Sequence, residues 1–190
     1  MSKTLFFVTT NKHKADSYTI RLQEIGWEIK TIPIDIPESR DFDVEAVARK
    51  KLLEAALRVK HRPIIVEDRG LRIASLNDFP KSHVKVATEV LGIPKLVEII
   101  DQTNPGVTFD YAIGLMEKDG EVKMFRGFET GRIIKRSPDE VTDLFDVFCS
   151  DVLPGKPLSS LSVEEKKIYE AYWTKTDALT CLIAYLKEYE

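Results

Sequence analysis

Residues 4–14 read Thr-Leu-Phe-Phe-Val-Thr-Thr-Asn-Lys-His-Lys, and this stretch indicates the fold class of the 190-residue chain. The apolar run from Leu5 to Thr9 is typical of a short strand buried in a sheet. It is too short for the apolar segment of a signal peptide, and no small-residue cleavage site follows it. A loosely helical apolar pattern then runs over 14–25 and ends at Gly26. A strand that leads directly into a helix is typical of α/β proteins.

The same alternation continues further along the chain. A second strand is predicted over 27–32, and Asp43 is a good N-cap for the helix that follows. Apolar residues recur every three or four positions over 44–59, which gives that helix one apolar face. The run Ile64-Ile65-Val66 is typical of a third, buried strand. Strand, helix, strand, helix and strand together predict an α/β core with some parallel pairing.

Antiparallel strands are expected in the second half. Alternating apolar residues over 109–115 and a returning strand over 122–130 flank Asp119-Gly120, a hairpin turn signal. A third strand is expected over 132–135. A helical apolar face formed by Leu179, Leu182, Ile183 and Leu186 closes the chain. We therefore predict a single mixed α/β domain over residues 1–190, with a long and partly antiparallel sheet.

The composition excludes several classes of protein. Apolar residues make up 43% of the chain and charged residues 31%, which is typical of a globular domain that folds without disulfides or structural metals. No apolar stretch is long enough to cross a membrane. The formal net charge of -3 argues against a nucleic-acid binder that works through phosphate contacts. Cys149 and Cys181 lack metal-type spacing, so a reducing, cytoplasmic location is expected.

The polar residues after the first strand form one candidate site. Thr9, Thr10 and Asn11 lie at a strand-to-helix junction, where backbone N–H groups and the helix dipole favour a bound phosphate. Lys14, one turn into the helix, is a candidate to contact that phosphate as a point charge. A helix cap followed by a solvated basic turn explains the same residues. The site is not a Walker loop, because the required glycines are absent.

Carboxylates supply a second candidate site. Glu67 and Asp68 follow the third strand, and the carboxyl ends of strands in an α/β sheet face the usual ligand crevice. With Glu38 from an earlier loop, they are candidates to hold Mg²⁺ and to activate a water. A cap at a solvated turn, closed by Gly70, is the alternative. Several cations have no distinctive pattern of their own: Lys85, Arg132, Lys166 and Lys175.

Taken in order, these pieces resemble the inosine-triphosphate pyrophosphatase family, whose members remove non-standard purine nucleoside triphosphates. The resemblance extends along nearly the whole chain, and the ordered set of motifs is more specific than any single one. The matching residues are Thr9, Asn11 and Lys14, then Glu38, Glu67-Asp68-Arg69-Gly70-Leu71, Leu76 to Pro80, Lys85, Phe125-Arg126-Gly127, Gly131-Arg132-Ile133 and Ser162 to Lys166.

The resemblance implies an elongated α/β domain with a central cleft between two lobes, usually in a homodimer. It implies Mg²⁺ near Glu38 and Asp68, and a water that attacks the α-phosphorus to give a nucleoside monophosphate and pyrophosphate. The residues expected to contribute to catalysis are Asp68, Glu67 and Lys14. The residues expected to bind the nucleoside triphosphate are Thr9, Thr10, Asn11, Lys14, Arg69, Lys85, Phe145, Asp146, Lys166 and Lys175.

The departures from the family pattern concern the base. The family's Ser-His-Arg segment is missing from residues 166–177, and its paired aromatics are reduced to Phe145, beside Asp146. Arg69 replaces a Ser or Thr that follows the Glu-Asp pair. Tyr169, Tyr172 and Trp173 are candidates for new stacking contacts with a base. Packing of these aromatics within the C-terminal helical region is the alternative.

Three hypotheses follow from these residues. The first is a Mg²⁺-dependent nucleoside-triphosphate pyrophosphohydrolase whose base specificity differs from that for inosine and xanthosine. The second is a catalytically weak or inactive nucleotide-binding relative that acts through a partner, because Arg69 brings a cation next to the carboxylates. A third and weaker hypothesis is nucleic-acid binding through Lys12, Lys14 and Arg49-Lys50-Lys51, where a solvated helix face is the simpler interpretation.

Overall fold

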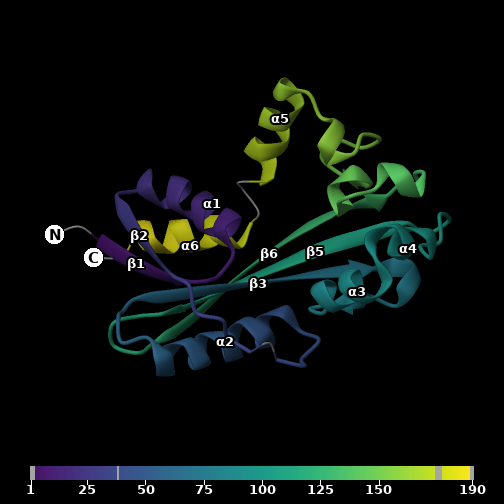
Figure 1. The fold of residues 1–190 in the computed structure, drawn as a ribbon. Coiled ribbons are helices and arrows are strands. Elements are labelled where there is room, and N and C mark those ends of the chain that lie inside the picture. Colours follow the sequence, from purple (N-terminus) through teal and green to yellow (C-terminus); the bar gives the residue numbers. More distant parts are fainter. Residues whose placement is uncertain (1–2, 38, 174–176, 189–190) are drawn as a thin grey trace. The chain divides into compact units, whose positions relative to one another are not determined.

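The computed structural model describes residues 3–37, 39–173 and 177–188 as a mixed α/β fold (Figure 1). The helices and strands alternate as expected in the first half of the chain. The strands are β1 (Lys3–Val8), β2 (Trp27–Ile32), β3 (Ile64–Ile73), β4 (Phe79–Lys81), β5 (Gly106–Met116), β6 (Val122–Ile133) and β7 (Phe148–Ser150). The helices are α1 (Lys12–Gln23), α2 (Val44–Arg58), α3 (Val84–Leu91), α4 (Ile93–Glu98), α5 (Val163–Trp173) and α6 (Ala178–Lys187).

The strands form one seven-stranded sheet in the order β2-β1-β3-β5-β6-β7, with β4 paired to β3. Strand β1 is parallel to both β2 and β3, while β3 and β4 are antiparallel, as are β6 and β7. This arrangement confirms the predicted mixed sheet with flanking helices. In the parallel pair β1 and β3, Phe7 lies opposite Ile65. The residues that follow Val8 and Val66 are therefore at the same level of the sheet.

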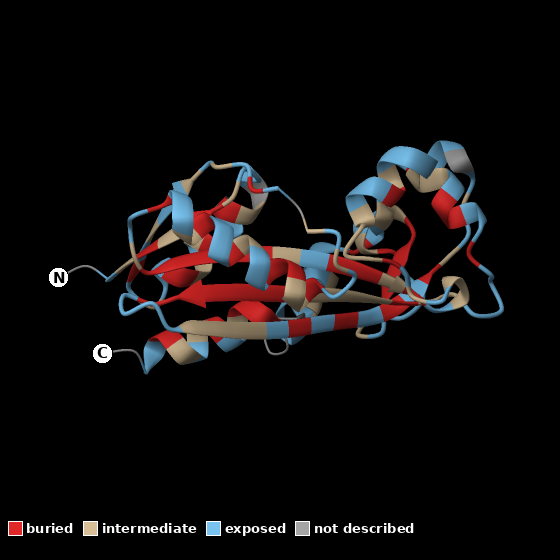
Figure 2. Cartoon of the chain, turned by 90° about the horizontal axis from the view of Figure 1, so that it is seen from below, coloured by how far each residue is buried: buried red, intermediate tan, exposed pale blue. Residues whose placement is uncertain are grey.

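Contacts within the chain divide it into two compact units. The first unit comprises Met1–Asp68, Tyr111–Gly127 and Ala178–Glu190, and the second comprises Arg69–Asp110 and Phe128–Asp177. Strands β3, β5 and β6 each contribute residues to both units. Figure 2 shows that the buried residues concentrate along the strands, whereas the helices are exposed on their outer faces.

The first unit buries both faces of its part of the sheet. Helices α1 and α6 pack on one face, where Leu22 and Leu182 contact the cluster that contains Phe7 and Ile65. Helix α2 covers the other face, where its Leu52 joins a cluster with Val8, Ile64 and Val66. Successive side chains of a strand point to opposite faces, so this packing shows which face each residue of β1 and β3 occupies.

Helix α2 begins as the sequence predicts. The side chain of Asp43 accepts hydrogen bonds from the backbone N–H groups of Glu45 (2.7 Å) and Ala46 (3.1 Å). These bonds satisfy two of the N–H groups that a helix leaves unpaired at its N-terminus. The predicted hairpin is also confirmed, because Gly120 has a φ of +94° in the turn between β5 and β6.

The second unit has its own apolar core. Leu71 and Ile73 of β3 pack with Leu96 of α4 and with Phe148 of β7. Strands β6 and β7 approach very closely at Gly131, where an added Cβ would lie 2.3 Å from the carbonyl oxygen of Cys149. Glycine is therefore the residue that allows this strand pairing.

Two details of the predicted strands are wrong. Residues 132–135 do not form a separate third strand, because β6 runs on to Ile133 and pairs there with β7. Glu67 and Asp68 do not follow the third strand but lie inside it, since β3 extends to Ile73. Gly70 is a buried strand residue and closes no turn. The polar sequence Glu-Asp-Arg does not predict a strand. Pairing with neighbouring strands, not local propensity, keeps these residues in β3.

Candidate phosphate-binding and metal site

The junction between β1 and α1 is organised by its polar side chains. Asn11 is the N-cap of α1, and its Oδ1 accepts a hydrogen bond from the backbone N–H of Lys14 at 3.0 Å. The backbone N–H of Asn11 donates in turn to Oγ1 of Thr9 at 3.1 Å. Thr10 is exposed between them. The predicted cap is thus confirmed, and it presents the N-terminus of a twelve-residue helix at the end of a parallel strand.

Lys14 does not belong to a solvated turn. Its Nζ lies 3.5 Å from Oε2 of Glu67, and its side chain is only 19% exposed. The side chain of Glu67 is 2% exposed, so the carboxylate of this ion pair is buried. The attraction of this buried carboxylate restricts the positions that the ammonium group of Lys14 can occupy. The pair joins the first turn of α1 to the middle of β3.

A second ion pair involves Lys51, which is not among the predicted residues of this site. Lys51 Nζ lies 3.9 Å from Oδ1 of Asp68 and donates a hydrogen bond to the backbone carbonyl of Glu67 at 3.3 Å. A signal for it was present in the sequence. Lys51 follows Val47 by four residues and precedes Leu52, so it lies on the apolar stripe of α2 where a solvated lysine is not expected.

The two adjacent carboxylates do not face the same way. Glu67 shares the face of Ile65 and meets Lys14 of α1, whereas Asp68 shares the face of Val66 and meets Lys51 of α2. They are therefore not arranged to hold one ion together. Asp68 fits a hard dication better than Glu67, because its side chain is 13% exposed whereas that of Glu67 is 2% exposed. Glu38, the other predicted ligand, lies outside the described residues.

Comparison with known proteins identifies the family. The sequence profile of the Ham1 family matches residues 5–180.

This chain belongs to the Ham1 family.

Its curated relatives include the dITP/XTP pyrophosphatase of Ignicoccus hospitalis, which is 27% identical over 88% of this chain and 89% of that protein. The dITP/XTP pyrophosphatase of Methanothermobacter marburgensis is 32% identical over 67% of each chain. The fold agrees with a solved HAM1 protein of Coxiella burnetii, with a TM-score of 0.74 at 22% identity over 98% of this chain and 99% of that one.

The other predicted nucleotide-binding residues of this Ham1-family chain belong to the second unit. Three of them are exposed cations: Arg69 on β3, Lys85 on α3 and Lys166 on α5. Arg69 follows Asp68 along β3, so the two side chains leave the strand on opposite sides. Lys175 lies outside the described residues.

Phe145 and Asp146 form part of a short 3-10 turn, Leu144–Asp146. Oδ2 of Asp146 accepts hydrogen bonds from the backbone N–H and the hydroxyl of Thr142 and from the backbone N–H of Asp143, each at 2.9 Å. The backbone hydrogen bonds from Asp143 and Thr142 are the main reason that the pKa of Asp146 falls to about 2. Phe145 is 46% exposed, and its ring centroid lies 6.3 Å from that of Phe109.

An acidic cluster of Glu117, Asp119 and Glu121 lies at the β5–β6 hairpin in the first unit. Its carboxylate oxygens lie within 4.8 Å of one another. Two of these residues accept hydrogen bonds within the chain, since Asp119 accepts the N–H of Glu121 and Glu117 accepts the hydroxyl of Tyr185. None of them is among the predicted metal ligands.

Among the residues that the structure describes, every helix is too short or too polar to span a lipid bilayer.

Proposed function

We propose that this chain is a Mg²⁺-dependent nucleoside-triphosphate pyrophosphohydrolase that releases a nucleoside monophosphate and pyrophosphate. The proposal rests on one observation, the two ion pairs in the first unit: Lys14 with Glu67 and Lys51 with Asp68. The first pair lies at the capped N-terminus of α1, where the backbone also favours an anion, and the second pair lies on the other face of β3, beside α2. The names of the relatives from Ignicoccus and Methanothermobacter support the same reaction class.

In this proposal each residue of the cluster has its own task. Lys14, held by buried Glu67, provides a positioned charge for the phosphates, and Thr9 and Asn11 shape the helix terminus that receives them. Asp68, with Glu38, provides the oxygen donors for Mg²⁺, which would neutralise phosphate charge and activate the attacking water. Glu67 acts through Lys14, so we assign it a positioning role.

We further propose that the base preference differs from that of dITP/XTP pyrophosphatases. The chain lacks a Ser-His-Arg segment after Lys166 and has Glu170-Ala171-Tyr172 within α5. A site that reads a base through hydrogen bonds loses its selectivity when those groups are replaced. The missing polar segment supports altered recognition of the base.

Pyrophosphate release tests the reaction directly. The panel contains inosine and xanthosine triphosphates, the standard ribo- and deoxyribonucleoside triphosphates and modified pyrimidine nucleotides, each with and without Mg²⁺. Asp68→Asn should lower the release rate at least roughly 100-fold, because it weakens a hard-cation ligand. Asp139→Asn, at an exposed carboxylate of the second unit, is the matched control and should leave the rate unchanged. Full activity of Asp68→Asn would remove that residue from the mechanism.

A nucleotide-binding relative without turnover is the second candidate function. The missing base-reading segment favours it. Calorimetry over the same panel distinguishes the two. Binding without pyrophosphate release from any nucleotide would support the binding relative, whereas Mg²⁺-dependent turnover of one panel member would exclude it.

The family resemblance also leads us to propose a homodimer and a cytoplasmic location. Light scattering coupled to size-exclusion chromatography tests the first point, since a homodimer has twice the 21.7 kDa mass of the chain. Fractionation of the source cells tests the second.

A further inference from the structure

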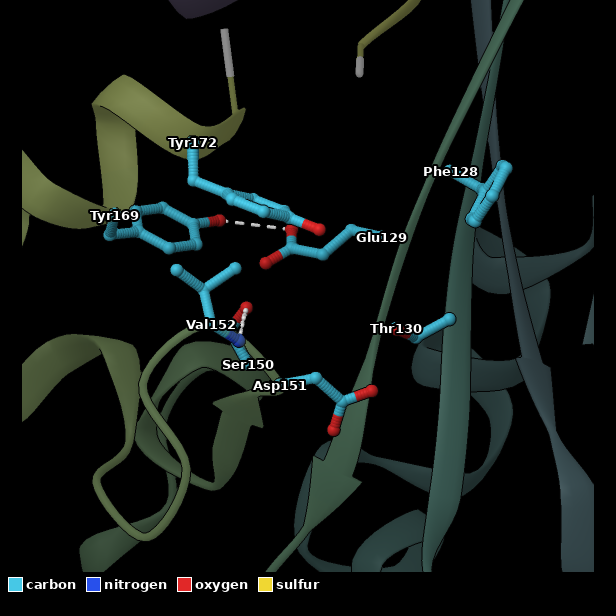
Figure 3. A pocket seen from close by; sticks show the side chains of 8 residues that line it. All are labelled: Phe128, Glu129, Thr130, Ser150, Asp151, Val152, Tyr169 and Tyr172. Carbon is cyan, nitrogen blue, oxygen red and sulfur yellow. Dashed lines mark hydrogen bonds between the residues drawn. The ribbon is translucent and has the colours of Figure 1, made fainter. Parts of the chain in front are cut away.

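A pocket in the second unit lies outside the cluster described above. Its volume is about 410 Å³, and strands β6 and β7 meet helix α5 around it (Figure 3). Phe128, Glu129 and Thr130 line it from β6, and Tyr169 and Tyr172 from α5. A volume of this size falls within the usual range for small-molecule sites.

Glu129 is the unusual residue of this pocket. It is 6% exposed, and its Oε2 accepts a hydrogen bond from the hydroxyl of Tyr169 at 2.9 Å. Its Oε1 is buried and has no hydrogen-bond partner among the residues that the structure describes. Burial raises the pKa of Glu129, and this effect outweighs the hydrogen bonding of Tyr169 and Ser150, which lowers it. Buried acceptors are normally satisfied, so an unpaired Oε1 on a residue that lines a cavity points to a ligand that donates to it.

The rest of the lining defines the shape of that ligand. Figure 3 shows the ring of Tyr172 beside the carboxyl group of Glu129. It also shows the side chains of Tyr169 and Val152 among those that line the pocket. Tyr172 is 53% exposed, which is unusual for a tyrosine that only serves packing. Aromatic side chains placed in this way offer stacking surface to a flat ring. A nitrogen heterocycle with an N–H group is a ligand of this kind, because it is flat and also donates a hydrogen bond.

We propose that the pocket between β6, β7 and α5 binds a nucleobase, which stacks on Tyr172 and donates an N–H hydrogen bond to Oε1 of Glu129. Identifying the ligand as a nucleobase rests on the proposed function, whereas the need for a planar hydrogen-bond donor rests on the pocket alone. Glu129 is then a specificity-determining residue, because a ring nitrogen that carries a methyl group would leave the buried carboxyl without a donor.

Free nucleosides test this proposal without any hydrolysis. Calorimetry measures the binding of inosine, uridine and adenosine, each beside the analogue whose donor nitrogen is methylated: 1-methylinosine, 3-methyluridine and N6,N6-dimethyladenosine. We expect at least one parent nucleoside to bind and its methylated analogue to bind at least roughly tenfold more weakly. Equal binding of parent and analogue, or no binding of any parent at millimolar concentration, would overturn the proposal.

Variants assign the binding to this pocket. Glu129→Gln keeps the size of the side chain but adds N–H donors, and it should weaken binding at least roughly tenfold. Tyr172→Ala should weaken it roughly 5- to 100-fold through lost stacking, and the chain should stay folded because Tyr172 is exposed. Glu140→Gln, at an exposed carboxylate of the same unit, is the control and should bind as the parent chain does. Unchanged binding in both pocket variants would show that the nucleoside binds elsewhere.

Inhibition kinetics distinguish two sources of such a base, the substrate itself and a separate effector nucleoside. Competitive inhibition of pyrophosphate release by the bound nucleoside would identify the pocket as the site for the base of the substrate. Inhibition or activation that does not compete with substrate would identify a separate effector nucleoside. Nucleoside binding in a chain that releases no pyrophosphate would leave this proposal standing and would contradict only the proposed reaction.

Discussion

Lys14 of α1 and Glu67 of β3 form an ion pair across 3.5 Å, in which the carboxylate is buried and the ammonium is only 19% exposed. This pair turns a basic residue that resembles an ordinary helix-surface lysine into a positioned charge. It also gives the two adjacent carboxylates different surroundings. Glu67 forms an ion pair with Lys14, whereas Asp68, on the other face of β3, is the better candidate for a metal ligand.

The ion pair should be visible in the free energy of unfolding. Lys14→Met leaves a buried carboxylate without this charge partner and should destabilise the chain by about 2 kcal/mol. Lys14→Met combined with Glu67→Gln should cost less than the sum of the single variants, with a coupling energy of roughly 0.5–3 kcal/mol. Urea unfolding measures all three values. Lys30→Met removes an exposed pair with Glu28 and should change stability by less than about 1 kcal/mol. Additive effects of Lys14→Met and Glu67→Gln would contradict the coupling.

The depressed pKa of Asp146 should give acid-dependent stability. Its pKa is about 2 in the folded chain, against 3.8 for an unperturbed aspartate side chain, so the folded state favours the carboxylate. The stabilisation is therefore complete above pH 3.8 and is lost as the pH falls toward 2. Asp146→Asn should melt at a lower temperature than the parent chain at pH 7, and this difference should shrink as the pH approaches 2. A difference that is independent of pH would show that the charge of Asp146 contributes nothing.

The raised pKa of Glu129 predicts the opposite dependence on pH. The folded state holds the proton of Glu129 more tightly than the unfolded state does, because burial and the neighbouring Asp151 disfavour its charge. Stability from this group is therefore present below its unfolded pKa of 4.5 and declines as the pH rises through the folded value. Glu129→Gln, which stays neutral, should raise the melting temperature at pH 8 but not at pH 4. An equal shift at both pH values would contradict the assignment.

Gly131 should tolerate no side chain. A Cβ at this position would lie 2.3 Å from the carbonyl oxygen of Cys149 and 2.5 Å from the ring of Phe148, and the backbone atom has little freedom to move. Gly131→Ala should destabilise the second unit by about 1–3 kcal/mol through overpacking. Gly106→Ala is the control, since its Cβ would meet nothing nearer than 3.9 Å. Equal stability of the two variants in denaturant titrations would show that β7 can move away from β6.

Much of the fold was predictable because local patterns carry it. The apolar stripe of α2, its Asp43 cap and the Asp119-Gly120 turn each depend on residues only a few positions apart. The extent of β3 was not predictable in this way. Its polar centre, Glu67 to Arg69, stays in a strand because the strands around it supply the hydrogen bonds.

The candidate site shows the same division. Thr9, Asn11 and Lys14 were identifiable because a strand-to-helix junction has a recognisable sequence and a known preference for anions. Lys51 was missed because its role depends on α2 packing against β3, and Glu129 because its burial depends on α5 and β7.

The sequence alone determined the α/β class, the order of most elements and the polar residues available for chemistry, because periodicity, caps and turns act over a few neighbouring residues. The tertiary structure alone decided which carboxylate faces which lysine and which acidic side chain is buried with an open oxygen. These depend on the face of a strand and on contacts between segments far apart in the chain. Glu129 and Tyr169, forty residues apart, meet only because β6 and α5 fold together.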